Sequence, residues 1–149
     1  MTSITHERAS DRCAEALLIE EKKLNLKYDV VVMVQGDEPL VVGMIETKPG
    51  LKNIREILSV KGLDAILIGP YDLSASLGLT GETSHPKVEK EINHILSCCI
   101  KLNIPAGIHI VNASVKEFKN KIKKGYRFIA YSIDTVFLNL NCKNPVEEL

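Results

Sequence analysis

The stretches MIETKPG at 44–50 and DAILIGPYDLS at 64–74 decide the fold of this chain. Each contains a short apolar strand followed by a carboxylate, Glu46 in the first and Asp72 in the second, and a helix-length segment separates them. Strands joined by such a helix pair in parallel, so their carboxyl ends meet at one edge of the sheet. Because hard divalent cations prefer carboxylate oxygens, this pattern predicts a metal site at that edge.

The alternation of strand and helix continues along the chain without exception from residue 41, which indicates parallel strands joined by βα crossovers. We expect strands at 41–46, 64–69, 106–111 and 127–132, helices at 51–60, 86–102 and 113–124, a helical turn at 71–78, and a short helix capped by Asp134. Upstream we expect a helix at 10–27 and a strand at 29–35. Only GDEP and a few residues join that strand to the next one, too few for a parallel crossover.

The composition describes one domain with a buried core, since the chain has 149 residues of which 45% are hydrophobic and 26% are charged. The formal net charge is zero, so nothing global favours a nucleic acid or an anionic membrane as a partner. No apolar run approaches the roughly 18 residues that span a bilayer. The stretch MTSITHERASDR lacks the apolar segment of a secretory signal, and we expect a cytoplasmic protein.

The cysteines show no pattern typical of a metal site or a redox site. None forms a CxxC pair, and none stands at a zinc-finger spacing from a histidine. We expect reduced thiols, buried or half-buried and without a functional role, at all four positions: Cys13, Cys98, Cys99 and Cys142.

Five stretches between about residue 42 and residue 138 follow the order and spacing of one enzyme family. They are MIETKPGLKNI, GLDAILIGPYDLSASLGLTGE, HPKVEKEI, PAGIHIV and GYRFIAYSIDTVFL. This part of the chain resembles the class II 2-oxo acid aldolases of the HpcH/HpaI family, whose fold is a (β/α)8 barrel. The resemblance implies an α/β fold in which these stretches form the last four βα units of a TIM-type barrel, a partial barrel.

The resemblance implies roles for three groups. Glu46 and Asp72 match the two carboxylates that hold Mg²⁺ or Mn²⁺ at the top of the barrel. The backbone amides of Tyr71 and Asp72 match the donors that bind the carboxylate of a small-molecule 2-oxo acid substrate. The implied activity is that of a carbon–carbon lyase releasing pyruvate or a similar 2-oxo acid from a hydroxy-oxo or keto-deoxy sugar acid.

The sequence also departs from the family pattern. No segment matches the first four strands, which carry a histidine base, its partner carboxylate and an arginine, and Met44 stands where many members have glutamine. We therefore assign no catalytic residue. A structural role is the better interpretation of three other polar residues: His109 in mid-strand, His85 before the helix-opening Pro86, and Asp134 as an N-cap.

Residues 1–41 resemble a different family, the CMP-Kdo synthetases, which are 3-deoxy-manno-octulosonate cytidylyltransferases. The stretches that carry this resemblance are MTSITHERASDRCAEAL and DVVVMVQGDEPLV. It implies that Asp37 is a Mg²⁺ ligand and that Gln35 lies near the nucleotide, both vestigial because the phosphate loop is missing. The alternative is a polar turn in which Pro39 sets the bend.

Two domains follow from these resemblances, a cytidylyltransferase-like helix and strand fragment at 1–41 and an aldolase half-barrel at 42–149. We expect a fusion near Val41–Gly43 whose aldolase activity is impaired. The alternatives are an inactive fusion fragment and a nucleotidyltransferase remnant. Unpaired strand edges of a partial barrel also favour a homo-oligomer or aggregation.

Overall fold

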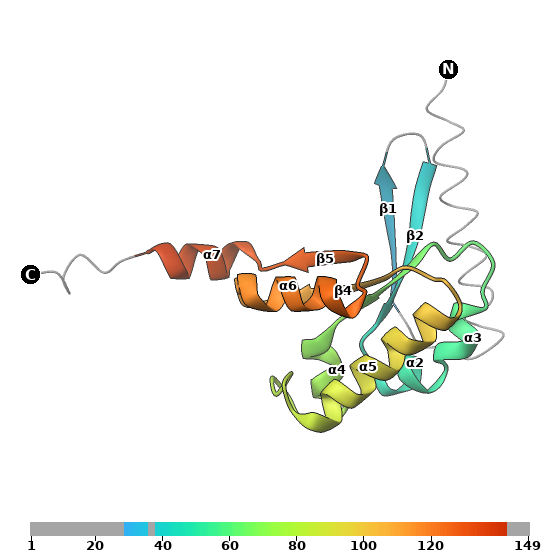
Figure 1. Cartoon of the computed structure of the whole chain (residues 1–149), viewed down its shortest axis with the longest axis horizontal. Coiled ribbons are helices and arrows are strands. Elements are labelled where there is room, and N and C mark those ends of the chain that lie inside the picture. The colour runs from blue at the N-terminus through green and yellow to red at the C-terminus, as the bar shows by residue number, and fades with distance from the viewer. Residues whose placement is uncertain (1–28, 36–37, 143–149) are drawn as a thin grey trace, which may run out of the picture.

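The computed structural model describes residues 29–35 and 38–142, and side-chain packing from Leu40 onward. The predicted helix at 10–27, Cys13 and Asp37 lie outside the described residues. Within them the chain forms one sheet of five strands in the order β1-β2-β3-β4-β5, with β2 to β5 parallel (Figure 1). The strands are β1 (Asp29–Gln35), β2 (Glu38–Ile45), β3 (Ala65–Ile68), β4 (Ala106–Ile110) and β5 (Phe128–Tyr131). The predicted α/β class with a parallel sheet is confirmed.

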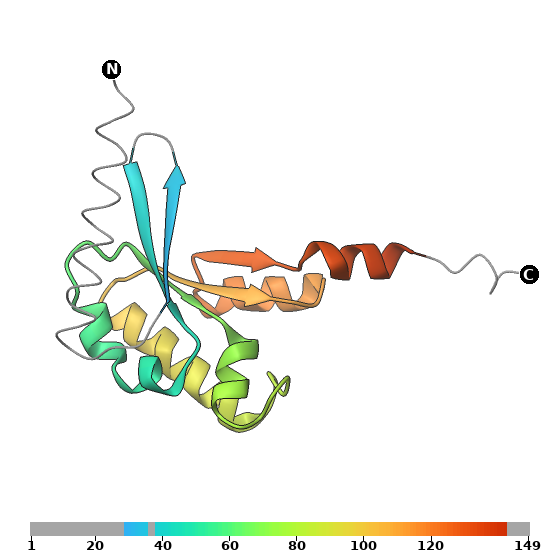
Figure 2. The same cartoon turned by 180° about the vertical axis from the view of Figure 1, so that it is seen from behind.

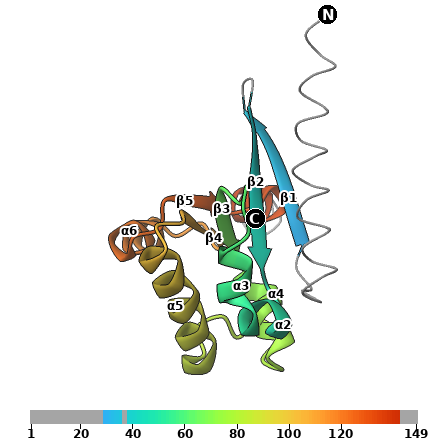
Figure 3. The same cartoon turned by 90° about the vertical axis from the view of Figure 1, so that its right-hand side faces the viewer.

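Strands β1 and β2 form an antiparallel hairpin that extends past the rest of the sheet (Figure 3). Their register runs from Asp29 opposite Met44 to Gln35 opposite Glu38, so the connection is too short for a crossover. Strand β2 starts at Glu38 rather than at the predicted residue 41, and Pro39 lies inside it. Pro39 is tolerated there because β3 pairs with β2 only from Val42, so the missing N–H removes no bond to β3.

Six helices follow the hairpin: α2 (Lys48–Lys52), α3 (Ile54–Leu58), α4 (Pro70–Ser76), α5 (Pro86–Lys101), α6 (Val115–Lys124) and α7 (Asp134–Asn141). The single helix predicted at 51–60 is two short helices, because the backbone of Asn53 leaves the helical region (φ −100°, ψ 18°). The N-cap of α7 is Ile133, so the capping role predicted for Asp134 is wrong. Asp134 is the first helical residue, and its Oδ1 accepts from the Thr135 amide at 2.7 Å.

The core lies between the sheet and helices α2 to α5, which group on one side of it (Figure 1, Figure 2). Alternate residues of the strands face this layer, among them the buried Ile45, Ile66, Ile68 and Ile108. Burying each of these isoleucine side chains contributes about 1.5–3 kcal/mol to the stability of the fold. The apolar stripe predicted for the long helix is buried throughout: Val88, Ile92, Ile95, Leu96 and Cys99. In the described part of the chain no helix is both long enough and apolar enough to cross a membrane.

Two of the cysteines lie in this core as reduced thiols, as predicted. Cys98 and Cys99 are buried, whereas Cys142 is exposed, contrary to expectation. Loss of hydration on burial, with a smaller contribution from Cys98, raises the pKa of the Cys99 thiol to about 12. Cys99 therefore stays protonated and unreactive at neutral pH.

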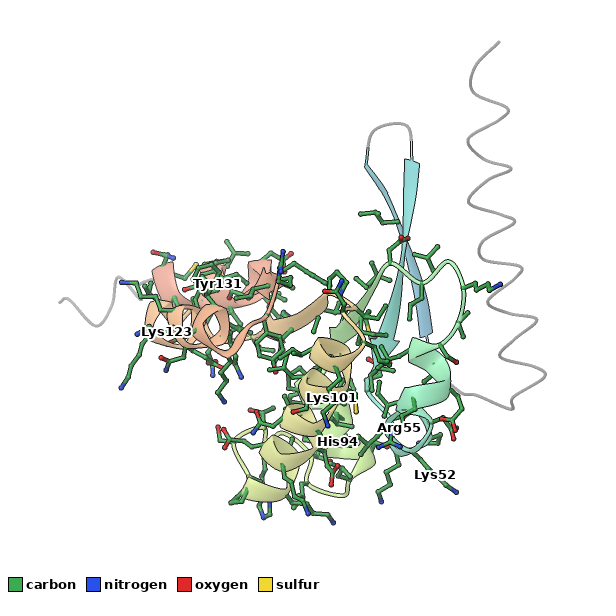
Figure 4. The ribbon with its side chains drawn as sticks, turned by 45° about the vertical axis from the view of Figure 1, so that its right-hand side comes forward. Lys52, Arg55, His94, Lys101, Lys123 and Tyr131 are labelled. Carbon is green, nitrogen blue, oxygen red and sulfur yellow. The ribbon has the colours of Figure 1, made fainter. Side chains whose placement is uncertain are left out.

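Helices α6 and α7 follow β4 and β5 toward the carboxyl end of the chain (Figure 1). Tyr131 of β5, labelled in Figure 4, packs edge-on against Phe118 of α6, with ring centroids 5.5 Å apart. Its ring centroid lies 6.2 Å from that of Phe137 of α7. Several apolar side chains of α7 stay exposed beyond this contact, among them Leu138 and Leu140.

Close packing at one glycine can be tested directly. A Cβ on Gly107 of β4 would overlap the ring of Phe128, its cross-strand partner on β5. We expect Gly107→Ala to lower the free energy of unfolding by about 1–3 kcal/mol, the usual cost of overpacking. Urea denaturation measures this change in the free energy of unfolding. The loss should shrink in a Phe128→Ala background, and an equal loss in both backgrounds would contradict the clash.

Candidate functional site

The two carboxylates singled out by the sequence come together at the carboxyl edge of the sheet. Glu46 directly follows β2, and Asp72 lies in the first turn of α4, which follows β3. A Cβ placed on Gly69, between them, would lie 3.1 Å from Glu46 Oε2 and 3.9 Å from Asp72 Oδ2. Both oxygens therefore lie close to Gly69, and the Glu46 side chain packs where a side chain on residue 69 would stand.

The protein offers two carboxylates at this edge. Among the described residues there is no group of three or more histidine, cysteine, aspartate or glutamate side chains that could hold a metal ion. A hard cation takes six or more oxygens, so water and substrate would have to supply the other positions. The donor chemistry of two carboxylates fits Mg²⁺ or Mn²⁺.

The start of α4 presents two backbone amides at the same edge. Gly69 is the N-cap and Pro70 is the first helical residue. The first intrahelical bond runs from the Leu73 amide to the Gly69 carbonyl at 3.0 Å. Helix geometry therefore leaves the amides of Tyr71 and Asp72 without an intrahelical acceptor.

Two serines hold this edge together, and the sequence interpretation missed both. Ser74 is fully buried, and its hydroxyl donates to the Tyr71 carbonyl at 2.6 Å and accepts from the Gly81 amide at 3.0 Å. Ser76 Oγ accepts from the Lys48 amide at 2.9 Å, which connects the start of α2 to α4. Nothing in the local sequence distinguishes these serines from others in a helical turn, because their partners Gly81 and Lys48 lie in other segments, seven and 28 residues away.

A third polar side chain, His109, stands near the end of β4. The register aligns three fully buried isoleucines on neighbouring strands: Ile45, Ile68 and Ile108. The residues that directly follow them along the chain are Glu46, Gly69 and His109, of which His109 alone lies within a strand. Because side chains alternate along a strand, the His109 side chain lies on the face opposite that of Ile108.

The half-buried His109 is held by the end of β5. Its Nε2 lies 3.4 Å from the Ser132 carbonyl oxygen. Ser132 has a left-handed backbone (φ 62°), and it is fixed by hydrogen bonds from its amide to the Ile110 carbonyl at 2.6 Å and from its hydroxyl to the Val111 carbonyl at 3.0 Å. A non-glycine residue in this region costs free energy, so these bonds are what maintain it.

A polar cavity of about 300 Å³ opens beside His109 at the carboxyl end of β4. Its lining includes Pro70 and Tyr71 but neither Glu46 nor Asp72. The other polar side chains come from the loop before α5, from α5, from the segment after β4 and from α6: Thr83, Ser84, Glu89, Asn93, Asn112, Glu117, Lys121 and Lys124. Lys121 is partly neutralised by Glu117, at 3.7 Å. The cavity therefore borders the carboxylate pair without containing it.

The remaining candidates lie elsewhere. His85 is the N-cap of α5, and its Nδ1 accepts from the Lys87 amide at 3.2 Å, so the structural interpretation of this residue is confirmed. Gln35 ends β1 at the tip of the hairpin, and nothing beyond its backbone is described.

Comparison with known proteins identifies the family. A sequence model described as "HpcH/HpaI aldolase/citrate lyase" matches residues 7–139. The chain belongs to the HpcH/HpaI family. The match begins at residue 7, so it includes most of the segment that resembles a cytidylyltransferase.

Individual relatives agree with this assignment. The chain is 35% identical over 103 residues to the 4-hydroxy-2-oxo-heptane-1,7-dioate aldolase of Shigella sonnei, covering 69% of this chain and 38% of that protein. It is 36% identical to the hydroxypyruvate/pyruvate aldolase of Sagittula stellata, covering 69% of this chain and 40% of that protein. A solved structure of a family member from Burkholderia cenocepacia superposes with a TM-score of 0.65 and 27% identity, over 72% of this chain and 41% of that one. The chain thus spans about two-fifths of the length of these relatives.

The buried hydroxyl of Ser74 generates a stability prediction. Ser74→Ala leaves the Gly81 amide without its acceptor, and we expect a loss of about 1–3 kcal/mol in the free energy of unfolding. Ser97→Ala, at an exposed position of the helix α5, is the matched control and should be neutral or slightly stabilising. Thermal and urea unfolding compare the two, and equal stability of both variants would refute the role assigned to Ser74.

Proposed function

We propose that the carboxyl edge of the sheet is the site of a metal-dependent 2-oxo acid aldolase, a carbon–carbon lyase. It would release pyruvate or a similar 2-oxo acid from a hydroxy-oxo or keto-deoxy sugar acid. The observation that carries the proposal is that Glu46 and Asp72 both place a carboxylate oxygen beside Gly69, at one edge of the sheet. Aldolase activity is named for the relatives, of which this chain spans about two-fifths.

Glu46 and Asp72 would hold Mg²⁺ or Mn²⁺. A bound divalent ion supplies Lewis acidity, which polarises the 2-oxo group of a substrate. The protein would contribute two carboxylates, while Ser74 and Ser76 connect α4 to Gly81 and to the start of α2.

The amides of Tyr71 and Asp72 would bind the substrate carboxylate, because they are oriented donors without an intrahelical acceptor. The polar cavity next to Tyr71 offers room for the oxygen-rich remainder of a hydroxy acid. No described segment corresponds to the family's histidine base and arginine, so we expect turnover by this chain alone to be slow.

The chain is also predicted to self-associate through the open edge of β5.

Removal of one carboxylate tests the metal site. We expect Glu46→Gln to weaken Mn²⁺ binding at least about tenfold, because a neutral amide replaces a charged ligand. Electron paramagnetic resonance of free Mn²⁺ measures the affinity, and pyruvate formation from 4-hydroxy-2-oxo-heptane-1,7-dioate should be lost in Glu46→Gln and after EDTA treatment.

Glu56→Gln is the matched control, since Glu56 is an exposed glutamate of α3 away from the edge. It should bind Mn²⁺ like the unmodified protein. Pyruvate formation that survives both EDTA and Glu46→Gln would exclude the metal-dependent mechanism.

The sequence QGDEP at 35–39 supports a second proposal, that residues 1–41 descend from a cytidylyltransferase, with Gln35 and Asp37 as vestigial nucleotide and metal residues. The boundary proposed near Val41–Gly43 falls inside β2, so both pieces contribute to one sheet. We expect calorimetric titration with CTP and Mg²⁺ to give no heat of binding, because the triphosphate loop is missing. A micromolar site would restore nucleotidyl transfer as a candidate.

A further inference from the structure

Charge is unevenly distributed along this chain. The formal net charge of the whole chain is zero. The stretch VKEFKNKIKKGYR at 115–127, which contains α6, has six lysine or arginine residues and one glutamate, a formal charge of +5. The rest of the chain therefore carries a formal charge of −5. Such an asymmetry indicates a surface that attracts an anionic partner.

Three lysines form a stripe along the outer face of α6: Lys116, Lys119 and Lys123. All three are exposed, their spacing puts them on one side of the helix, and Lys123 points away from the sheet (Figure 4). In the part of the chain that the structure describes, none of the three forms an ion pair, since Glu117 pairs with Lys121. Helix stability does not explain the stripe, because Lys116 lies in the first turn, where the helix dipole disfavours a cation.

Exposed aliphatic side chains border this lysine stripe. Val115 and Ile122 are 61% and 52% exposed, and their spacing of seven residues puts them on one side of α6. Between them, Phe118 packs against Tyr131, whose ring also lies near that of Phe137 of α7. Phe137 is itself exposed, so the apolar surface continues from α6 to α7.

The combination of lysines and exposed aliphatic side chains distinguishes between possible occupants of this surface. A second copy of the chain does not fit, because pairing two α6 faces brings like charges together. A nucleic acid would neutralise the lysines, but its phosphates and sugars offer nothing apolar to Val115 and Ile122. An anionic bilayer satisfies both groups, since its headgroup phosphates attract lysines and its acyl boundary accepts aliphatic side chains.

We propose that α6 docks on an anionic lipid bilayer. The helix lies in the plane of the headgroups, with Val115 and Ile122 toward the acyl chains and the lysine stripe among the lipid phosphates. This surface is separate from the proposed aldolase site, because none of its side chains lies at the edge that carries Glu46 and Asp72.

Vesicle flotation measures this binding. The unmodified protein should float with vesicles of equal parts phosphatidylglycerol and phosphatidylcholine, and should stay unbound with phosphatidylcholine alone. Added salt should release it, because salt screens exposed charges. The triple variant Lys116→Gln, Lys119→Gln, Lys123→Gln should bind about 10²-fold more weakly, since each lysine at an anionic surface contributes a factor of about five. Thermal unfolding checks that the variant keeps its fold.

The matched control removes the same number of charges elsewhere: Lys52→Gln, Lys87→Gln and Lys90→Gln, at exposed positions of α2 and α5. Lys52 lies on the opposite side of the molecule from Lys123 (Figure 4). This control should bind vesicles like the unmodified protein. Ile122→Ser tests the aliphatic side chains and should weaken binding about three- to tenfold, because it removes apolar area that the bilayer would bury.

Several results would overturn the proposal. Equal weakening in both triple variants would assign vesicle binding to net charge rather than to α6. Binding to duplex DNA but not to anionic vesicles would assign the surface to a nucleic acid. Binding to neither, or unchanged vesicle binding by Ile122→Ser, would exclude docking of α6 on a bilayer. The proposed aldolase function stands or falls separately, since Mn²⁺ affinity and pyruvate formation measure it.

Discussion

The parallel pairing of β2 with β3 is the constraint on which the site depends. The register sets Ile45 beside Ile68, and the Gly69 amide continues the ladder to the Ile45 carbonyl at 3.2 Å. One step further along each strand come Glu46 and Gly69, and the turn of α4 then delivers Asp72 to the same place. A slip of one residue would turn the apolar face of β3 away from the core, so burial of the isoleucines also fixes the carboxylates.

The core and the candidate site are therefore held by the same contacts. Each candidate residue that follows a strand at this edge comes directly after an isoleucine of the core cluster. The loops contribute as well, since Ser74 and Ser76 connect α4 to the segments that follow and precede it. In parallel α/β folds of the barrel type, sites are built from strand ends and from the loops that follow them.

Much of this arrangement could be read from the sequence, for identifiable reasons. The β-branched runs and the stripe of α5 report burial directly, and the short link at GDEP excludes a parallel connection. The break at Asn53 and the cap at Ile133 were not predicted, because helix boundaries are set within one or two residues by backbone dihedrals that the apolar pattern does not report. The hydrogen bond from the Lys48 amide to Ser76 also escaped, because it joins two segments that lie 28 residues apart in the sequence.

The antiparallel hairpin has a topological consequence. In a closed parallel barrel, the outer side of β2 would receive another strand running in the same direction, yet β1 already occupies that side in the opposite direction. Among the described strands, a further strand can therefore extend the parallel set β2 to β5 only at β5, unless β1 first detaches. A strand added at β1 would widen the sheet without lengthening its parallel part.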